Sequence, residues 1–502
     1  LTRVADYRMR RRAFLAASAT TAASAAAFST IGVSAANADY TTTVDPGTSW
    51  GTWEGWGTSL AWWAKAFGNR DDIADIFFTL NSAPYNGSTL PGLGLNIVRY
   101  NAGACSSNSV GGTTMVKGAA VLPTRQMEGY WLDWYSQDPA SASWNWYVDA
   151  PQRNMLWKAR DRGVNHFELF SNSPMWWMCY NHNPSGSADG TSDNLQSWNY
   201  QQHAVYLATI AKYAHDNWGF QFTSVEAFNE PISGWWKADT SSQEGCHFDV
   251  STQQTVINYL RAELNSRGLG GALLSASDEN TYDQARATFL GLDGTAQGNV
   301  GKINTHGYQY GGGRRDLLYA TAKSAGKVLW NSEYGEGDAT GMSLASNLNL
   351  DLTWLHPTAW VYWQVLDGGG WGAIQCDEAA GTTGAVNTKY YVLAQFTRHI
   401  RPGMQLIDSG DHNSVAAYDA ANHKLVIVST NYGTGQYINF DLSKFGTVTG
   451  SGGNGLVGRW ATQTGGGDAY TYHADTFLHG KVFWSYFSPN TVQSFEIDGV
   501  YR

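Results

Sequence analysis

The sequence KVLWNSEYG at residues 327–335 carries the pattern that indicates the fold. A short apolar run leads to Glu333 and then to a turn-forming glycine. The sequence VEAFNEP at residues 225–231 repeats this arrangement, with Glu230 between an apolar run and a proline. We therefore expect each glutamate at the carboxyl end of a β-strand, where parallel β/α barrels carry their active sites.

Runs typical of strands alternate with runs typical of helices from about residue 55 to residue 395. The eight predicted strands are Gly57–Trp62, Leu95–Tyr100, Phe167–Ser171, Val225–Phe228, Leu273–Ser277, Ile303–His306, Val328–Ser332 and Trp360–Val365. Helices are expected between them, for example over Ala204–Asn217, Gln253–Ser266 and Arg314–Ala325. Eight successive strand–helix units predict an α/β fold, the (β/α)8 TIM barrel. The long loops after the second, third and fourth strands are expected to build a substrate cleft.

The pattern changes after His399, where short alternating runs are separated by Gly, Asn and Asp. These runs are Ser414–Tyr418, Lys424–Thr430, Tyr437–Leu442 and Val492–Ile497. They predict an associated β-sandwich domain. The Thr-rich segment Tyr40–Val44 is expected to join it. The predicted domains are therefore a catalytic barrel over residues 53–397 and a β-sandwich made of residues 39–52 plus 398–502.

The N-terminal segment is typical of a targeting signal. The sequence RRRAFL at residues 10–15 is basic and then apolar, and an Ala-rich stretch follows as far as Ala36-Asn37-Ala38. This pattern predicts a twin-arginine secretion signal over residues 1–38 that is removed from the mature protein. Later in the chain no run of about 18 apolar residues occurs, so we expect a secreted, extracellular protein without a membrane span.

The composition of the 502 residues favours a large core and a neutral ligand. Hydrophobic residues make up 43% and charged residues 15%, which disfavours disorder. The 23 Trp and 27 Tyr indicate either an aromatic core or surfaces on which sugar rings stack. A net charge of −10 argues against nucleic acid and anionic membranes as partners.

The four cysteines are Cys105, Cys179, Cys246 and Cys376. An even number in a secreted chain permits two disulfides in any of three pairings, and free buried thiols are the alternative. Their spacing matches no metal-ligand pattern. The sequence contains no P-loop, no nucleotide-binding glycine motif and no HExxH motif, so neither a metal nor a cofactor is expected.

Two carboxylates that face each other across a cleft are the usual equipment for glycoside hydrolysis. The fourth and seventh strands of an eight-stranded barrel lie opposite each other, which would place Glu230 across from Glu333. We expect Glu230 to be the general acid/base and Glu333 to be the ionised nucleophile. Other carboxylates compete for these roles, namely Glu168, Asp278, Glu279, Glu336 and Asp367.

Several neighbouring polar and aromatic residues are candidates for binding the sugar. Asn229 precedes the proposed acid and can hydrogen-bond a hydroxyl next to the anomeric carbon. His306 ends the sixth strand and can orient the nucleophile or a hydroxyl, and Trp363 can form the floor beneath the cleaved sugar. Asn172 and Trp176 follow the third strand, although Trp176 can equally be core.

These motifs together resemble glycoside hydrolase family 30. The matching segments are GWGTSLAWWA at residues 55–64, SPMW at 173–176, NEP at 229–231, HGY at 306–308 and SEYG at 332–335. The resemblance covers essentially all of residues 39–502. It implies retaining hydrolysis of β-linked sugars, with Glu230 as acid/base and Glu333 as nucleophile. The substrate-binding residues expected from both arguments are Asn229, His306, Tyr308, Trp363, Trp176, Asn172 and Trp62.

Within that family the Trp62-Trp63 pair and the Trp-rich loops are most similar to the endo-β-1,6-galactanase branch. Branches that act on glucosides generally carry an acidic residue where this chain has Trp62. The resemblance therefore implies an enzyme that hydrolyses β-1,6-galactan side chains of arabinogalactan. Separately, we expect the protein to be a monomer. The alternatives are an exo-acting β-1,6-galactobiohydrolase, a β-1,6-glucanase, a β-xylanase or a non-catalytic glycan-binding protein.

Overall fold

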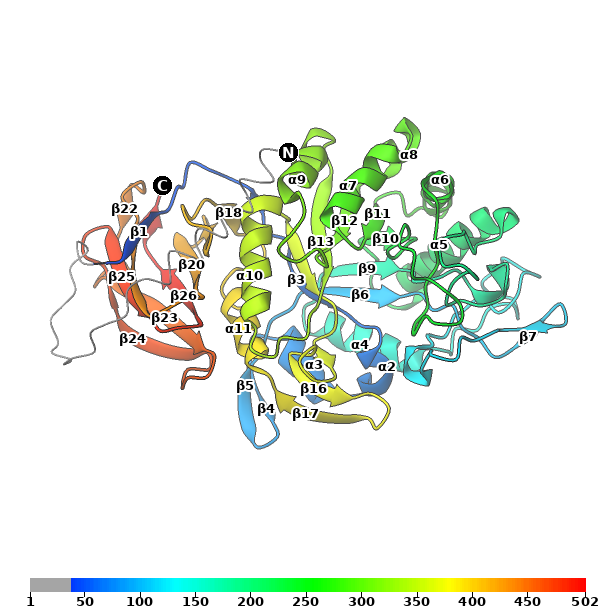
Figure 1. The fold of residues 1–502 in the computed structure, drawn as a ribbon, viewed down its shortest axis with the longest axis horizontal. Coiled ribbons are helices and arrows are strands. Elements are labelled where there is room, and N and C mark those ends of the chain that lie inside the picture. Colours follow the sequence, from blue (N-terminus) through cyan, green and yellow to red (C-terminus); the bar gives the residue numbers. More distant parts are fainter. Residues whose placement is uncertain (1–37) are drawn as a thin grey trace. The chain divides into compact units, whose positions relative to one another are not determined.

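The computed structural model describes residues 38–502, which form two compact units (Figure 1). The larger unit contains residues 54–339 and 354–390, and the smaller one contains residues 38–53, 340–353 and 391–502. The predicted secretion signal lies outside the described residues except for Ala38. Among the described residues, no helix has both the length and the apolar character needed to cross a bilayer.

The larger unit is the predicted barrel. Its eight parallel strands pair in chain order and close between the last and the first. They are β3 (Gly55–Ser59), β6 (Ile97–Asn101), β9 (His166–Phe170), β10 (Ser224–Glu226), β11 (Leu273–Glu279), β12 (Lys302–His306), β13 (Val328–Tyr334) and β14 (Ala359–Tyr362). Each predicted run overlaps its strand. The first prediction extends to Trp62, three residues too far, because buried residues past the strand end continue the apolar run.

Helices follow most of these strands and surround the barrel (Figure 1). In the larger unit they are α2 (Trp63–Phe67), α3 (Asp71–Phe78), α4 (Ala150–Asp161), α5 (Tyr200–Asn217), α6 (Val250–Ser266), α7 (Tyr282–Gly291), α8 (Gly294–Asn299) and α9 (Arg315–Ser324). Helix α10 (Met342–Leu350) belongs to the smaller unit, and α11 (Thr388–Thr397) spans the division between the two. The helices predicted at α5, α6 and α9 are confirmed to within four residues at each end.

The loops after β6, β9 and β10 are long, as predicted. They contain the short hairpin β7 (Ser109–Val110) and β8 (Thr113–Thr114) and the short 3-10 helices η2 (Pro123–Arg125), η3 (Trp176–Met178) and η4 (Ser197–Asn199). A further hairpin, β4 (Ser82–Tyr85) and β5 (Ser88–Pro91), precedes β6. A three-stranded sheet after β14 was not predicted. It consists of β15 (Leu366–Asp367), β16 (Ile374–Asp377) and β17 (Thr382–Val386). Its strands are only two, four and five residues long, too short to show a clear apolar alternation.

The smaller unit contains two sheets whose inner faces share an apolar core that includes Ile427, Phe440, Phe483 and Phe495. One sheet has the order β1 (Tyr40–Thr43), β21 (Gln436–Asp441), β25 (Val482–Phe487). The other has the order β2 (Gly51–Thr52), β18 (Gln405–Ile407), β19 (Ser414–Asp419), β20 (Lys424–Asn431), β26 (Thr491–Ile497), β23 (Leu456–Gln463), β24 (Thr471–Phe477). A short ladder joins β22 (Thr447–Val448) to β27 (Val500–Tyr501).

This arrangement agrees with the predicted sandwich, including its N-terminal strand. The segment Tyr40–Thr43 pairs with residues 438–441 in parallel register. The paired segments are almost 400 residues apart in the chain, so residues from both ends of the sequence build this unit.

The interior of the barrel contains buried charges. The Arg99 guanidinium contacts Glu168 Oε1 at 3.0 Å and also pairs with Asp278. Lys302 Nζ lies 2.6 Å from Glu168 Oε2. All four side chains are at most 1% exposed. Because a buried charge is tolerated only when it is paired, this network ties together the strands that carry it.

All four cysteines lie in the described part of the chain and are free thiols, so the disulfide alternative is not realised. Three of them are buried, and Cys376 is partly exposed. Cys105 Sγ lies 3.2 Å from Glu244 Oε1. The three buried cysteines therefore pack as small core residues.

Candidate active site

The two candidate glutamates meet at the carboxyl ends of β10 and β13. Glu333 lies within β13, and Glu230 follows the last residue of β10 by four positions. One carboxylate oxygen from each and one ring nitrogen of His306 lie within 4.8 Å of one another. Retaining glycosidases hold their carboxyl groups about 5–5.5 Å apart, whereas inverting ones hold them about 6.5–9.5 Å apart. The observed spacing favours the retaining geometry.

Glu333 is a buried carboxylate surrounded by donors. Tyr308 Oη donates to its Oε1 at 2.8 Å, and Arg99 Nη1 donates to its Oε2 at 3.1 Å. His306 Nδ1 lies 3.6 Å from Oε1. Burial raises the pKa of Glu333, while the positive charges of His306 and Arg99 oppose that rise. These contacts hold the carboxylate in one orientation and favour its ionised form.

Glu230 is held from both its side chain and its backbone. Asn280 Nδ2 donates to its Oε1 at 2.7 Å, and His306 Nδ1 lies 3.0 Å from the same oxygen. The backbone N–H of Glu230 donates to the carbonyl of Asp278 at 2.8 Å, and Trp236 Nε1 donates to the Glu230 carbonyl at 3.0 Å. The φ angle of 49° at Glu230 is in the left-handed region, which costs energy for a residue with a side chain. Strain of this kind is typical of functional positions.

His306 connects the two glutamates to Asp278. Its Nε2 lies 3.0 Å from Asp278 Oδ1. Burial alone would lower the pKa of His306, but the carboxylates of Glu333 and Asp278 raise it well above its usual value. The pKa of Asp278 is held low by Arg99 and His306, against the effect of burial. The raised pKa favours an imidazolium, which pairs electrostatically with Asp278 on one side and hydrogen-bonds Glu230 on the other.

A register shift in the barrel brings these groups together. In the β12–β13 ladder, Thr305 pairs with Asn331, but His306 pairs with Glu333 instead of Ser332. The extra residue in β13 is a β-bulge, a feature that commonly re-aims side chains next to active sites. Sequence alone does not reveal this shift, because it depends on pairing between two strands.

Other predicted binding residues carry buried polar atoms that have no hydrogen-bond partner among the described residues. These atoms are Asn229 Oδ1, the amide oxygen and nitrogen of Asn172, and the indole nitrogen of Trp62. Buried polar atoms are rarely left unpaired, so atoms in this state next to catalytic groups are suited to bind ligand hydroxyls.

Aromatic side chains form a cluster at the same end of the barrel. Trp62 and Trp363 pack edge to face with ring centroids 5.2 Å apart, and Phe170 belongs to the same cluster. The Arg125 guanidinium lies 4.2 Å above the Trp62 ring. Trp176 is placed elsewhere. It is fully buried, and its indole donates to Ser106 Oγ at 2.6 Å. This residue therefore packs among the loops, and its contact with the sugar stays a prediction.

Three residues at the site were not predicted from the sequence. They are Arg99, Asn280 and Gln364, whose side-chain amide contacts the backbone of Trp62. Gln364 Oε1 accepts the N–H of Trp62 at 2.8 Å. Asp278 was considered only as a competing catalytic carboxylate. The available signal for Arg99 was a single charged residue inside the strand IVRYN at residues 97–101. Nothing local distinguishes Asn280 or Gln364 from other loop amides.

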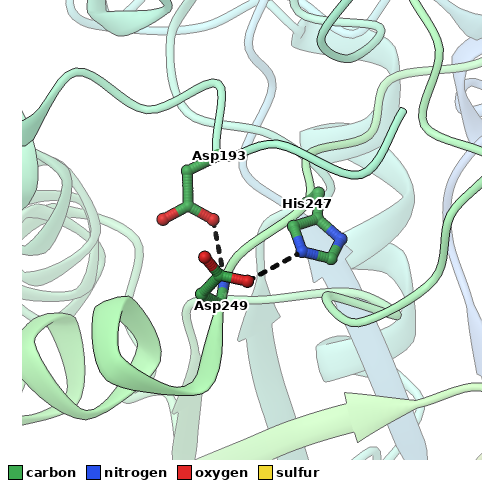
Figure 2. A group of neighbouring side chains, drawn as sticks. All are labelled: Asp193, His247 and Asp249. Atoms are coloured by element: carbon green, nitrogen blue, oxygen red, sulfur yellow. Dashed lines mark hydrogen bonds and ion pairs between the residues drawn. The ribbon is translucent and has the colours of Figure 1, made fainter. Parts of the chain in front are cut away.

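A second group of ligand-like side chains consists of Asp193, His247 and Asp249 (Figure 2). Asp193 accepts the backbone N–H of Asp249 at 2.6 Å and the Thr252 hydroxyl at 2.5 Å, so it caps the first turn of α6. Asp249 Oδ1 lies 3.3 Å from His247 Nε2. The positive end of the α6 dipole favours carboxylates and disfavours a cation here. We assign this group a capping role.

The sequence is similar to those of known glycoside hydrolases. The family model described as O-Glycosyl hydrolase family 30 matches residues 37–292. An endo-beta-1,6-galactanase of Hypocrea rufa is 61% identical over 93% of this chain and 96% of its own length.

Two solved structures share the fold. A conserved exported protein of Bacteroides fragilis superposes with a TM-score of 0.71 at 18% identity, covering 91% of this chain and all of that one. A family 30 subfamily 8 xylanase of Clostridium acetobutylicum superposes with a TM-score of 0.66 at 20% identity, covering 91% of this chain and 99% of that one.

Proposed function

The chain belongs to glycoside hydrolase family 30, and we propose that it is an endo-β-1,6-galactanase that acts by a retaining double displacement. The observation that carries the substrate is the 61% identity, over nearly the full length of both proteins, to an enzyme of that name. The observation that supports the mechanism is the close approach of Glu230 and Glu333. We further propose that the protein is secreted, on the basis of its N-terminal sequence, and that it acts as a monomer.

In the first step Glu333 attacks the anomeric carbon of the bound galactosyl unit, and the bond to the linking oxygen breaks. Glu230 gives its proton to that oxygen, so the leaving chain departs as a neutral alcohol. The product of this step is a galactosyl ester of Glu333. In the second step Glu230 takes a proton from water, the water oxygen attacks the anomeric carbon, and Glu333 is released.

The groups around the glutamates support these roles. Tyr308 and Arg99 donate hydrogen bonds to the Glu333 carboxylate while it is charged. Once an ester has formed, the same donors can still bond its oxygen atoms. His306 donates toward Glu230, which stabilises the carboxylate that Glu230 becomes after giving up its proton. Both effects act within a buried site, where electrostatic interactions are stronger than in water.

We propose that the sugar is recognised by the buried polar groups that have no hydrogen-bond partner among the described residues. Asn229 and Asn172 offer amide atoms to hydroxyl groups near the cleaved bond. Trp62 and Trp363 offer indole surface and the Trp62 N–H. The tryptophan at position 62, in place of a carboxylate, points to a different recognition of O4, the hydroxyl that is axial in galactose and equatorial in glucose.

The decisive experiment is a digest of de-arabinosylated arabinogalactan, β-1,6-glucan and xylan, with products sized over time. An endo-galactanase is expected to release a ladder of β-1,6-galacto-oligosaccharides from the first substrate alone. One short product from the earliest times would indicate the exo-acting alternative. Release from glucan or xylan would overturn the substrate assignment and leave the mechanism in place.

The non-catalytic alternative is tested by the same digest. The Glu333→Gln protein is the matched control, because it keeps the shape of the site and lacks the nucleophile. If wild type and Glu333→Gln released equal amounts of sugar, the activity would come from a contaminant. If neither released any sugar but both bound galactan, the protein would be a glycan-binding module.

A further inference from the structure

The smaller unit contains an open cleft of about 420 Å³. Its walls come from β24, an edge strand of the seven-stranded sheet, from β25, an edge strand of the three-stranded sheet, and from their neighbours. These strands are labelled in Figure 1. The volume is within the range of about 300–1,000 Å³ that is usual for small-molecule sites. Every lining residue belongs to the smaller unit, whereas Glu230 and Glu333 belong to the larger one.

Strands β25 and β26 carry apolar side chains on their inner faces, except where these faces line the cleft, and there the side chains are polar. Along the inner face of β26, Ile497 and Phe495 are part of the sandwich core, but the next inner position is Gln493. Along β25, Phe483 and Phe487 are core residues, and Ser485 lies between them on the same face. Because polar side chains cost stability in a core, their placement at a cleft indicates a surface that meets polar ligand groups.

The polar groups of the cleft form an ordered set of donors and acceptors. Ser485 Oγ donates to Gln493 Oε1 at 2.7 Å, and Gln493 Nε2 donates to the carbonyl of Tyr486 at 2.8 Å. Arg459 donates to both oxygens of Asp475, at 2.9 and 2.6 Å. A bidentate pair has fixed geometry, and its remaining N–H groups and lone pairs can bind adjacent hydroxyl groups of a polyol.

Aromatic rings flank these polar groups. Tyr437 and Tyr486 lie in contact, with centroids 5.1 Å apart, and Tyr486 is 48% exposed. Trp484 also lines the cleft and stacks on His479 at 4.2 Å. The electron-rich face of an aromatic ring attracts the C–H groups of a sugar ring. Polar groups beside exposed aromatic rings are therefore suited to a carbohydrate.

The charge of the cleft argues for a neutral ligand. One guanidinium, Arg459, faces two carboxylates, Asp468 and Asp475, among the lining residues. An anion such as phosphate would meet more negative than positive charge here and would be repelled. A neutral sugar chain meets no such barrier.

We propose that this cleft is a second, non-catalytic binding site for the polysaccharide substrate, which it holds on the protein between cleavage events. The identity of the sugar, a β-1,6-linked galactan, rests on the proposed function. Two sites on one protein raise the effective concentration of the polymer at the catalytic residues. The cleft should therefore matter for long chains and not for substrates too short to reach both sites.

The test uses the full-length Glu333→Gln protein, because this variant should not cleave the ligand. The protein is titrated with a β-1,6-linked galactohexaose in a calorimeter. Two bound molecules per protein are expected. Adding Tyr486→Ala should leave one, or weaken the second site at least fivefold. Asp475→Asn, whose side chain is 58% exposed in the parent, should do the same. Tyr501→Ala is the matched control, because Tyr501 is 45% exposed, lies in the same unit and does not line the cleft.

A second readout uses the active enzyme. Tyr486→Ala should lower kcat/KM several-fold on polymeric galactan and leave the value on a galactobioside unchanged, with Tyr501→Ala equal to wild type on both. One binding site in both Glu333→Gln and its Tyr486→Ala derivative would overturn the proposal. So would equal kinetics of Tyr486→Ala and wild type on the polymer. A wild-type enzyme that fails to cleave galactan would instead overturn the proposed function.

Discussion

Glu230 and Glu333 differ in their surroundings although both are buried glutamates at strand ends. Glu333 contacts a tyrosine hydroxyl and the Arg99 guanidinium, which stabilise its charged form against the rise in pKa that burial causes. Glu230 contacts the Asn280 amide and His306, and it lies at the start of an exposed loop. This asymmetry supports the assignment of nucleophile and acid/base and makes the two roles separately testable.

Replacing Glu230 with Ala should affect substrates according to their leaving groups. Departure of a sugar alcohol needs the proton of Glu230, so hydrolysis of galactan should fall by about 10²–10⁴-fold. An aryl galactoside with an acidic phenol needs little protonation and should lose far less. Kinetics on the two substrates make the comparison. Glu333→Gln is the control and should lose at least about 10³-fold on both. Equal losses on both substrates for Glu230→Ala would contradict its acid role.

Replacing His306 with Gln should shift the pH dependence of activity. The imidazolium lowers the pKa of Glu333, which burial raises. Without that charge Glu333 takes up its proton at higher pH, so the acidic limb of the kcat/KM profile should move to higher pH. Asn280→Ala removes an uncharged neighbour of Glu230 and should leave the acidic limb in place. An unmoved limb in His306→Gln would show that the imidazolium does not act on Glu333.

The barrel strands are joined by the ion network as well as by their hydrogen bonds. Lys302 on β12 reaches Glu168 on β9, and its ammonium lies 3.2 Å from the centre of the Trp330 ring. Lys302→Met would leave Glu168 with one cation fewer in a fully buried site. Unfolding free energy should fall by about 3–5 kcal/mol, measured by urea denaturation. The surface pair of Lys158 and Asp71 is the matched control, and Lys158→Met should cost less than about 1 kcal/mol.

A double variant separates lost pairing from lost packing in this network. Glu168→Gln combined with Lys302→Met removes both charges of the pair. It should regain part of the stability lost in Lys302→Met alone, because residue 168 then no longer carries a buried negative charge that has lost its ammonium partner. A double variant less stable than either single variant would show that packing of the Lys302 side chain dominates.

The first turn of α6 depends on a carboxylate from a distant loop. Asp193→Ala should lower the free energy of unfolding by about 1 kcal/mol, because it removes the acceptor for the Asp249 N–H. Chelation with EDTA should not change the melting temperature of the wild-type protein, because the group acts as a cap. A fall in melting temperature on chelation, reversed by Zn²⁺, would show that this group binds a metal ion.

The smaller unit depends on segments from both ends of the chain. Strand β1 pairs with β21, and the shared core is built almost entirely from residues after 400. A chain that ends at residue 399 would keep β1, β2 and residues 340–353 without the sheets that they join. We expect this truncated protein to be insoluble, as measured by the soluble fraction after expression. Soluble, active protein would show that the barrel folds without that unit.

The number and order of the barrel strands, the sandwich and the two catalytic candidates could be predicted from the sequence because each depends on local patterns. Apolar periodicity, turn residues and the position of a glutamate after a strand are visible within about ten residues. Tertiary structure decided the rest. Arg99 reaches carboxylates 69, 179 and 234 positions away in the chain, and the β12–β13 bulge brings His306 beside Glu333. The free cysteines, the burial of Trp176 and the polar cleft likewise depend on distances between segments that no local pattern encodes.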